Sequence, residues 1–210
     1  EVVSEFGHHE VLKLASNENP LGASPKALSI LTELKNDLHL YPDGNGTKLK
    51  EDIANHENVP FDNIIIGNGS NEILELAARA FLNPNASSIV SKHAFAVYKI
   101  VTQSAGASLI EVPTHNWGHD LKSFEDYLDS STRVIFIANP NNPTGTYNSH
   151  KEVHSLLKKV PSSILVVLDC AYFEYVTKGD YVKPLDLLNR FDNLLITKTF
   201  SKIHGLASIR

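Results

Sequence analysis

The stretch Val134-Ile-Phe-Ile-Ala-Asn-Pro-Asn-Asn-Pro-Thr-Gly145 joins an apolar run to a polar loop that contains two prolines. Residues 134–138 have no alternating polar position, which is typical of a strand buried on both faces of a parallel sheet. In open sheets of this kind, ligands bind beyond the carboxyl ends of the strands. The loop at 139–145 therefore lies where a ligand site is expected.

Short apolar runs of the same kind recur along the chain. They predict further buried strands at residues 64–66, 88–90, 109–112, 164–168 and 194–197. Stretches with apolar residues at helical spacing lie between them, at 71–81 and at 150–159. Strands that alternate with helices predict an α/β fold, a three-layer sandwich built on a mainly parallel sheet.

The first sixty residues follow a different pattern. Ser24 and Pro25 are typical of an N-cap and of the first helical position, and the apolar stripe of this helix consists of Leu28, Leu31, Leu34 and Leu38. We expect residues 1–60 to form an N-terminal arm with helices, and residues 61–210 to form one large domain. Because the 210 residues include no methionine, not even an initiator, and the chain stops without polar trailing residues, we also expect a fragment that is cut at both ends.

The bulk composition narrows the class of protein. The chain has 210 residues, of which 42% are hydrophobic, so it is long enough to bury a core. Its net charge of -5 gives no reason to expect nucleic acid as a partner. The single cysteine, Cys170, excludes an intramolecular disulfide. No apolar run approaches the roughly 18 residues of a membrane span, so we expect no membrane partner and a cytoplasmic location.

The segment Gly67-Asn-Gly-Ser-Asn-Glu72 joins a predicted strand to a predicted helix. Its glycines allow close approach, and the amides of Ser70 and Asn71 at the helix start could hold a phosphate. Glu72 stands where a dinucleotide fingerprint needs its third glycine, and no P-loop lysine follows, so neither a dinucleotide nor ATP is favoured. A plain turn with an ordinary N-cap is the alternative.

Two other loops follow predicted strands. Each proline restricts the residue before it to extended backbone, so the amides of Asn139 and Asn142 are aimed by a stiff loop; a structural turn is the alternative. Asp169 ends the run at 164–168, and Tyr172 follows three residues later. A buried carboxylate needs a cation or several donors, and a helix N-cap or a structural ion pair would also satisfy it.

The last candidate stretch contains Lys202 and Arg210. A lysine amine that is partly withdrawn from water can act as a nucleophile, and an arginine fork suits a phosphate, although a solvated lysine is the commoner case. His115 and His119 have the i,i+4 spacing of zinc ligands, but a turn lies between them. We expect a solvent-facing loop there and no metal site.

Together, these loops supply a phosphate cradle, an amide donor, a buried aspartate beside a tyrosine, and a lysine near an arginine. Pyridoxal 5'-phosphate requires this set: a lysine for its Schiff base, an aspartate at its pyridine nitrogen, donors to its ring hydroxyl and an anion site. The residues therefore predict pyridoxal phosphate as the cofactor.

The motifs that carry a family resemblance are Asn139-Pro-Asn-Asn-Pro-Thr-Gly145, Asp169-Cys-Ala-Tyr172 and Thr199-Phe-Ser-Lys-Ile-His-Gly-Leu-Ala-Ser-Ile-Arg210. They resemble the signatures of the fold-type I aminotransferases, which share the fold of aspartate aminotransferase. Three further stretches are Lys13-Leu-Ala-Ser-Asn-Glu-Asn-Pro-Leu-Gly22, Tyr41-Pro-Asp-Gly-Asn-Gly46 and His93-Ala-Phe-Ala-Val-Tyr98. These narrow the resemblance to the histidinol-phosphate aminotransferase family.

The resemblance implies a role for each matching residue at the ring. Lys202 would form the Schiff base with the cofactor and move the proton during catalysis. Asp169 would keep the pyridine nitrogen protonated, and Asn142 and Tyr172 would donate to the ring oxygen. Phe95 would stack on the ring face, where relatives often have a tyrosine.

The same resemblance implies that Ser70, Asn71, Ser201 and Arg210 hold the cofactor phosphate. Tyr41 would reach that phosphate in the partner subunit, which requires a homodimer. Two departures from the family pattern are Cys170, where glutamate is usual, and Ser208-Ile-Arg210, where Gly-Leu-Arg is usual.

The implied reaction is transfer of an amino group between L-histidinol phosphate and 2-oxoglutarate, which gives imidazole-acetol phosphate and L-glutamate in histidine biosynthesis. Relatives also have a small C-terminal domain and a further N-terminal segment, so we expect this fragment alone not to turn over. The alternatives within the fold are an aromatic amino-acid aminotransferase and a phosphothreonine decarboxylase. From another class, the alternative is a non-catalytic, cofactor-binding sensor domain of a transcription regulator.

Overall fold

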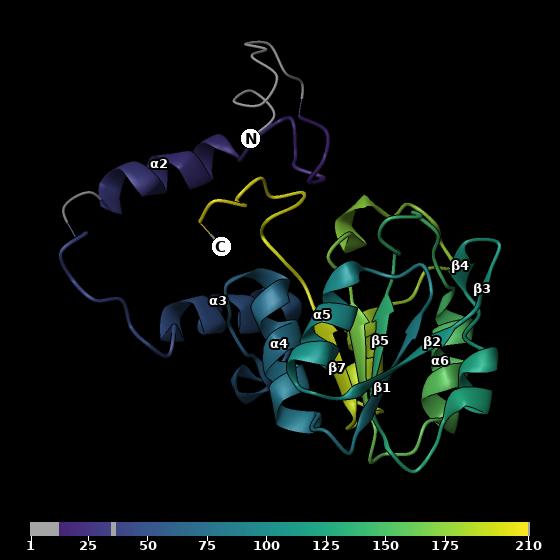
Figure 1. The fold of residues 1–210 in the computed structure, drawn as a ribbon. Helices are drawn as coiled ribbons and strands as arrows, with labels where there is room; N and C mark the ends of the chain where they lie inside the picture. The colour runs from purple at the N-terminus through teal and green to yellow at the C-terminus, as the bar shows by residue number, and fades with distance from the viewer. Residues whose placement is uncertain (1–12, 35–36, 210) are drawn as a thin grey trace, which may run out of the picture.

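A computed structural model describes residues 13–34 and 37–209 (Figure 1). Within these residues, a parallel sheet has the strand order β2-β1-β5-β6-β7. Its strands are β1 (Ser87–Ser91), β2 (Ser108–Val112), β5 (Thr132–Ala138), β6 (Leu165–Asp169) and β7 (Leu194–Thr197). The chain moves outward from β1 to β2 in one direction and from β5 to β7 in the other, so the strand order reverses between β1 and β5. Ligand sites of open α/β sheets lie at such a reversal.

The register of the strands aligns their carboxyl ends. Ala138 of β5 lies beside Asp169 of β6, and Asp169 lies beside Thr197 of β7. The loops that follow these three strands therefore leave the sheet at one edge. This edge brings together segments that are far apart in the sequence.

Helices cover both faces of the sheet (Figure 1). On one face, α4 (Gly69–Phe81) and α5 (Ala96–Ser104) pack on Val134 and Phe136 of β5. On the other face, α6 (His150–Lys159) and α7 (Pro184–Leu188) pack on Ile135 and Ile137 of the same strand. Each such fully buried side chain contributes about 1.5–3 kcal/mol. The predicted three-layer α/β fold is confirmed, and so is the strand at the quoted stretch.

The helix before the sheet is shorter than its apolar stripe indicated. α2 (Pro25–Glu33) begins as expected, because the Ser24 side chain accepts a hydrogen bond from the Ala27 amide at 3.2 Å. It ends at Glu33, so Leu38 lies outside it, and it contains no buried residue. The following helix is α3 (Thr47–Glu57), and Figure 1 shows α2 standing away from the sheet. The predicted division at residue 60 stays a prediction.

The predicted strand at residues 64–66 is wrong. These residues follow the 3-10 turn η2 (Phe61–Asn63) and pair with no strand in the described part of the chain. Ile65 is 65% exposed and Ile66 is 36% exposed. A short apolar run becomes a strand only where a neighbouring strand offers its backbone, and local propensity does not contain this information.

The prediction that His119 lies in a solvent-facing loop is also wrong, although His115 is exposed. The short strands β3 (Thr114–His115) and β4 (Gly118–His119) form a hairpin that turns the His119 ring inward. Its Nδ1 lies 2.7 Å from Ser91 Oγ, and its Nε2 lies 2.7 Å from the Ala138 carbonyl oxygen. Burial lowers the pKa of His119, so the neutral ring joins the ends of β1 and β5 as a structural element.

Two further 3-10 turns complete the described elements, η3 (Ser123–Tyr127) and η4 (Phe173–Tyr175). Across the described segments 13–34 and 37–209, no helix is long and apolar enough to cross a membrane.

Candidate active site

A cavity of about 520 Å³ lies at the carboxyl edge of the sheet. Its walls come from residues 15–18, from the first turn of α4, from Phe95 at the start of α5, and from the segments after β5, β6 and β7. The structure brings these residues with predicted site roles together in its lining: Ser70, Asn71, Phe95, Asn142, Asp169, Tyr172, Ser201 and Lys202.

Asp169 ends β6 and is 4% exposed. Its Oδ2 accepts a hydrogen bond from the Tyr98 hydroxyl at 2.8 Å, and its Oδ1 accepts from Thr197 Oγ1 at 2.9 Å and from the Ala171 amide at 3.2 Å. Burial raises the pKa of Asp169, and these donors and the charge of Lys202 oppose that rise. The cavity wall therefore carries a carboxylate that is deprived of water and suited to a cationic or protonated partner.

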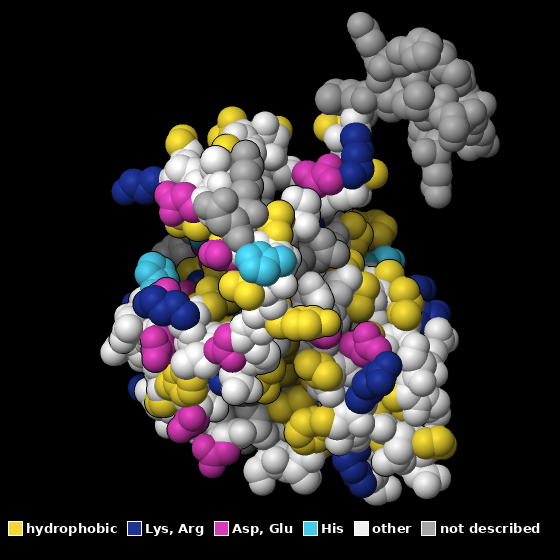
Figure 2. All heavy atoms as spheres, turned by 90° about the vertical axis from the view of Figure 1, so that its left-hand side faces the viewer, with side chains coloured by type: hydrophobic (Ala, Val, Ile, Leu, Met, Phe, Trp, Pro, Cys, Tyr) yellow, Lys and Arg dark blue, Asp and Glu magenta, His cyan; other side chains and the backbone are white. Residues whose placement is uncertain are grey.

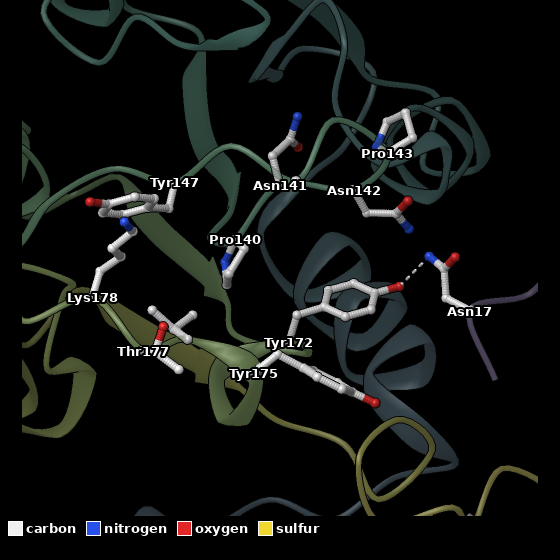
Figure 3. Close-up of a pocket in the computed structure, with 12 residues that line it drawn as sticks. Asn17, Pro140, Asn141, Asn142, Pro143, Tyr147, Tyr172, Tyr175, Thr177 and Lys178 are labelled. Carbon is white, nitrogen blue, oxygen red and sulfur yellow. Dashed lines mark hydrogen bonds between the residues drawn. The ribbon is translucent and has the colours of Figure 1, made fainter. Parts of the chain in front are cut away.

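Tyr172 lies just after β6 and faces the N-terminal segment (Figure 3). Its hydroxyl accepts a hydrogen bond from Asn17 Nδ2 at 2.9 Å, so its own proton is available to another acceptor. Asn142, in the loop after β5, lines the same cavity as Tyr172 (Figure 3). A neighbouring cavity of about 500 Å³ shares Asn17, Pro140, Asn142 and Tyr172 with the first.

Lys202 lies in the loop that follows β7. Its Nζ donates to the Ser16 carbonyl at 2.9 Å and lies 5.6 Å from the centre of the Tyr172 ring. By contrast, Lys198 at the end of β7 is held by Glu57 and Glu174, at 2.7 Å and 3.1 Å. Of these two lysines, Lys202 therefore presents its amine to the cavity, whereas Lys198 makes a structural ion pair.

Another part of the cavity wall is formed by the start of α4. Ser70 and Asn71 lie in its first turn, where backbone amides have no partner within the helix. Such amides and the helix dipole favour an anion. Ser201 also lines this cavity, and its hydroxyl accepts from Thr199 at 3.0 Å.

In the loop after β5, the side chain of Asn139 makes structural hydrogen bonds, whereas Asn142 lines the cavity. Asn139 is fully buried. Its side-chain Nδ2 donates to the Asn148 carbonyl at 3.0 Å, and its Oδ1 accepts from the Asn148 amide at 2.8 Å. The Tyr181 hydroxyl donates to the backbone carbonyl of Asn139. The expectation that Asn139 presents its amide to a ligand is therefore wrong, because the fold uses both ends of that amide. Asn142 lines the cavity.

Of the predicted site residues that the structure describes, Tyr41 is not in the cavity lining. Tyr41 is fully exposed. Arg210 lies outside the described residues.

Known proteins of similar sequence and structure identify the family. The profile of the family described as "Aminotransferase class I and II" matches residues 9–210. The chain belongs to this aminotransferase family. The family prediction from the motifs is confirmed.

Particular members of the family are similar over nearly the whole chain. Histidinol-phosphate aminotransferase 2 of Pseudomonas fluorescens is 53% identical over 95% of this chain, and the protein of that name from Nitrosospira multiformis is 50% identical over 100%. The crystal structure of histidinol-phosphate aminotransferase from Sinorhizobium meliloti, in complex with pyridoxal-5'-phosphate, superposes with a TM-score of 0.94 at 26% identity and covers 100% of this chain. The chain spans 54% of the length of both relatives and 57% of that solved chain.

Two residues of this site were not predicted from the sequence. Tyr98 is fully buried in α5 and reaches Asp169, and Asn17 reaches Tyr172. Both lie in stretches that carried the family resemblance, at 93–98 and 13–22. The motifs marked the right stretches, but spacing alone did not say which side chains point into the site.

The segment at residues 13–22 packs closely on the Lys202 loop. Asn19 Nδ2 donates to the Ile203 carbonyl at 2.7 Å, and Gly205 has a φ of +68°. A Cβ at Gly205 would lie 2.4 Å from the backbone of Gly22. Only glycine fits this close approach.

We expect Gly205→Ala to lower the free energy of unfolding by more than the roughly 1–3 kcal/mol that left-handed backbone strain costs, because a clash with the Gly22 backbone adds to that strain. The measurements are thermal unfolding and the rate of proteolytic cleavage within residues 13–22. Gly179→Ala is the control, since a Cβ there meets no atom within 4 Å. Equal melting temperatures for the two variants would contradict the close packing of these segments.

Proposed function

We propose that the full-length protein containing this chain is a pyridoxal-phosphate-dependent aminotransferase. Its reaction transfers an amino group between L-histidinol phosphate and 2-oxoglutarate, in histidine biosynthesis. The observation that carries the proposal is the shared cavity of Asp169, Lys202 and the start of α4, which offers a carboxylate, an amine and an anion site. The names of relatives that are 53% and 50% identical support the choice of substrate.

The donor set fits the cofactor. Pyridoxal phosphate, when bound, supplies a conjugated ring that withdraws electrons from the α-carbon of the substrate. Asp169 would hold a proton on the ring nitrogen, since a buried carboxylate favours a cationic neighbour. Tyr172 and Asn142 would donate to the ring oxygen, and the aromatic side chain of Phe95 would cover the ring face.

Lys202 would hold the aldehyde carbon until the amine of the substrate displaces it. The freed amine, when neutral, would take a proton from the α-carbon of the substrate and would then deliver it to the former aldehyde carbon. Ser70, Asn71, Ser201 and Arg210 would hold the phosphate through backbone amides, hydroxyls and a guanidinium. With its phosphate and ring nitrogen fixed, the aldehyde carbon stays within reach of the lysine.

Chemical trapping tests the cofactor assignment. The full-length protein, loaded with pyridoxal phosphate and reduced with borohydride, should carry a label on the peptide that contains Lys202. A label on another lysine, or no label, would overturn the assignment. The alternative of a non-catalytic sensor predicts the same label without turnover.

Rates test the substrate assignment. L-Histidinol phosphate should be the amino donor with the highest kcat/KM, ahead of phenylalanine, with 2-oxoglutarate as acceptor. A higher value for phenylalanine would indicate an aromatic amino-acid aminotransferase. Release of carbon dioxide from phosphothreonine would indicate a decarboxylase.

A homodimer and a cytoplasmic location belong to the same proposal. The face of the molecule that carries α2 has several apolar side chains in view (Figure 2). The exposed apolar residues in and after this helix are Leu28, Ile30, Leu34, Leu38, Leu40 and Tyr41. A second copy of the chain would remove them from water and would bring Tyr41 to the partner's cavity. The cytoplasmic location is supported by Cys170, a buried free thiol.

Hybrid dimers test this role of Tyr41. Tyr41→Ala and Lys202→Ala subunits, each impaired alone, should regain activity when mixed, because one site of the hybrid then has both native residues. If Tyr41 served the site of its own subunit, no site would be complete and mixing would restore nothing. Sedimentation of the unsubstituted protein gives the assembly state independently.

A further inference from the structure

Tyr98 is a buried phenol whose hydroxyl is directed at the proposed cofactor site. It lies in the first turn of α5, three residues after Phe95, and is 0% exposed. Its hydroxyl donates to Asp169 Oδ2 at 2.8 Å. The two residues are 71 positions apart in the chain, so this contact depends on the packing of α5 against the sheet.

Aromatic contacts fix the ring of Tyr98. It stacks on Phe136 of β5 with a centroid distance of 5.1 Å and an interplanar angle of 6°. Its other aromatic neighbour is Phe95, at 5.7 Å and 88°, an edge-to-face contact. Because both arrangements are favourable for aromatic pairs, the ring is held from two sides and its hydroxyl stays directed at Asp169.

The two oxygens of Asp169 are used unequally. Oδ1 accepts from Thr197 and from the Ala171 amide, whereas Oδ2 accepts from Tyr98. A carboxylate oxygen can accept about two hydrogen bonds, so Oδ2 can take a second donor. Tyr98 therefore donates to Oδ2, the carboxylate oxygen that can still accept a hydrogen bond from a ring nitrogen.

We propose that Tyr98 is a positioning residue of the cofactor site, which holds Asp169 as an anionic acceptor for the ring nitrogen and supports Phe95 from behind. This inference rests on the proposed function, because it assumes that pyridoxal phosphate occupies the cavity. Tyr98 itself need not touch the cofactor. It acts through the two residues that would contact the ring nitrogen and the ring face.

The titration behaviour of the pair agrees with this role. Burial raises the pKa of Asp169, and the hydrogen bond from Tyr98 opposes that rise. Burial and the nearby Asp169 charge raise the pKa of Tyr98, so the phenol stays a neutral donor. Other titratable groups coupled to this pair include Cys170, Tyr172, Tyr181 and Lys202.

The nitrogen of the bound cofactor tests the proposal directly. We expect Tyr98→Phe in the full-length protein, loaded with ¹⁵N-labelled pyridoxal phosphate, to shift the nitrogen resonance toward that of unprotonated pyridine. The reason is that a carboxylate which loses a donor becomes more basic and draws the shared proton to itself. Thr197→Val removes a donor from Oδ1 and should shift the resonance in the same direction, which guards against a folding artefact of one variant.

Cofactor affinity adds a readout that needs no turnover. Tyr98→Phe should weaken the binding of pyridoxal phosphate to the cofactor-free protein by about tenfold, the effect of one charge-assisted hydrogen bond. In an Asp169→Asn background the same substitution should have almost no effect, because its route to the cofactor is gone. A purely structural role would give equal losses in both backgrounds.

Tyr147→Phe is the matched control, because its hydroxyl donates to the exposed Asp180 at 2.9 Å. This variant also loses a tyrosine-carboxylate hydrogen bond and should leave the nitrogen resonance unchanged. An unchanged resonance and affinity in Tyr98→Phe would overturn the inference while the label on Lys202 upholds the proposed function. Absence of cofactor binding by the unsubstituted protein would instead reject the proposed function itself.

Discussion

Lys202→Ala is expected to reduce transamination in the full-length protein by at least about 10⁴-fold. The amine is assigned both covalent attachment of the cofactor and proton transfer at the substrate, and a group that combines these roles has a large effect when removed. Little structural loss should accompany the change, since the contacts of the Lys202 amine are the Ser16 carbonyl and the face of the Tyr172 ring. The measurements are single-turnover rates and borohydride labelling.

Lys198→Ala is the control for this experiment. Lys198 lies four residues earlier, but Glu57 and Glu174 hold its amine. Its loss should lower stability while the label and the rate are retained. A small primary amine in solution should restore part of the proton transfer in Lys202→Ala but not the covalent label. Substantial turnover by Lys202→Ala without added amine would show that another group moves the proton.

The sheet was predictable because its signal is local. Runs such as 134–138 are apolar at every position, and the strands they form are buried on both faces. The run at 64–66 has the same composition but no neighbouring strand, so pairing rather than propensity decided the outcome. The capping residue Ser24 likewise marked a helix start, whereas the end of α2 at Glu33 was not encoded in its leucine stripe.

The site was predictable where its residues directly follow strands. Asp169 and the loop at 139–145 come at strand ends, and the shared edge of a parallel sheet brings them together. Tyr98 and Asn17 were missed because their partners are 71 and 155 positions away. Asn139 was misjudged for the opposite reason: its side chain closes a contact with Asn148, nine positions on, within its own loop.

Asp169→Asn is expected to lower the rate by about 10²–10³-fold, the usual effect of removing one preorganised electrostatic contact. An amide has no negative charge with which to hold a proton on the ring nitrogen. The geometry should survive, because Asn can still accept from Thr197 and Ala171, and the Tyr98 hydroxyl can turn to accept from the new amide group. Rates with saturating cofactor, and the nitrogen resonance of labelled pyridoxal phosphate, measure the effect.

The same substitution should stabilise the cofactor-free protein at neutral pH. Burial raises the pKa of Asp169 in the folded state. A raised carboxylate pKa contributes stability below the unfolded value of about 3.9, and this contribution is lost as the pH rises through the folded value. At neutral pH the buried anion therefore opposes folding, and the neutral amide does not. An advantage of about 1 kcal/mol would raise the melting temperature by about 2–4 °C.

An aspartate of opposite behaviour provides the control. Hydrogen bonds, first that from the Ser131 side chain, lower the pKa of Asp129, so its contribution is present at neutral pH and is lost as the pH falls. Asp129→Asn should therefore destabilise the protein at pH 7, whereas Asp169→Asn stabilises it. The advantage of Asp169→Asn should shrink toward pH 4, whereas the loss in Asp129→Asn should shrink only as the pH falls below the unfolded carboxyl value of about 3.9. If Asp169→Asn were less stable than the unsubstituted protein at every pH, the donors around Asp169 would more than offset its burial. Its carboxylate would then be a structural element and not a charge held at a cost for the cofactor.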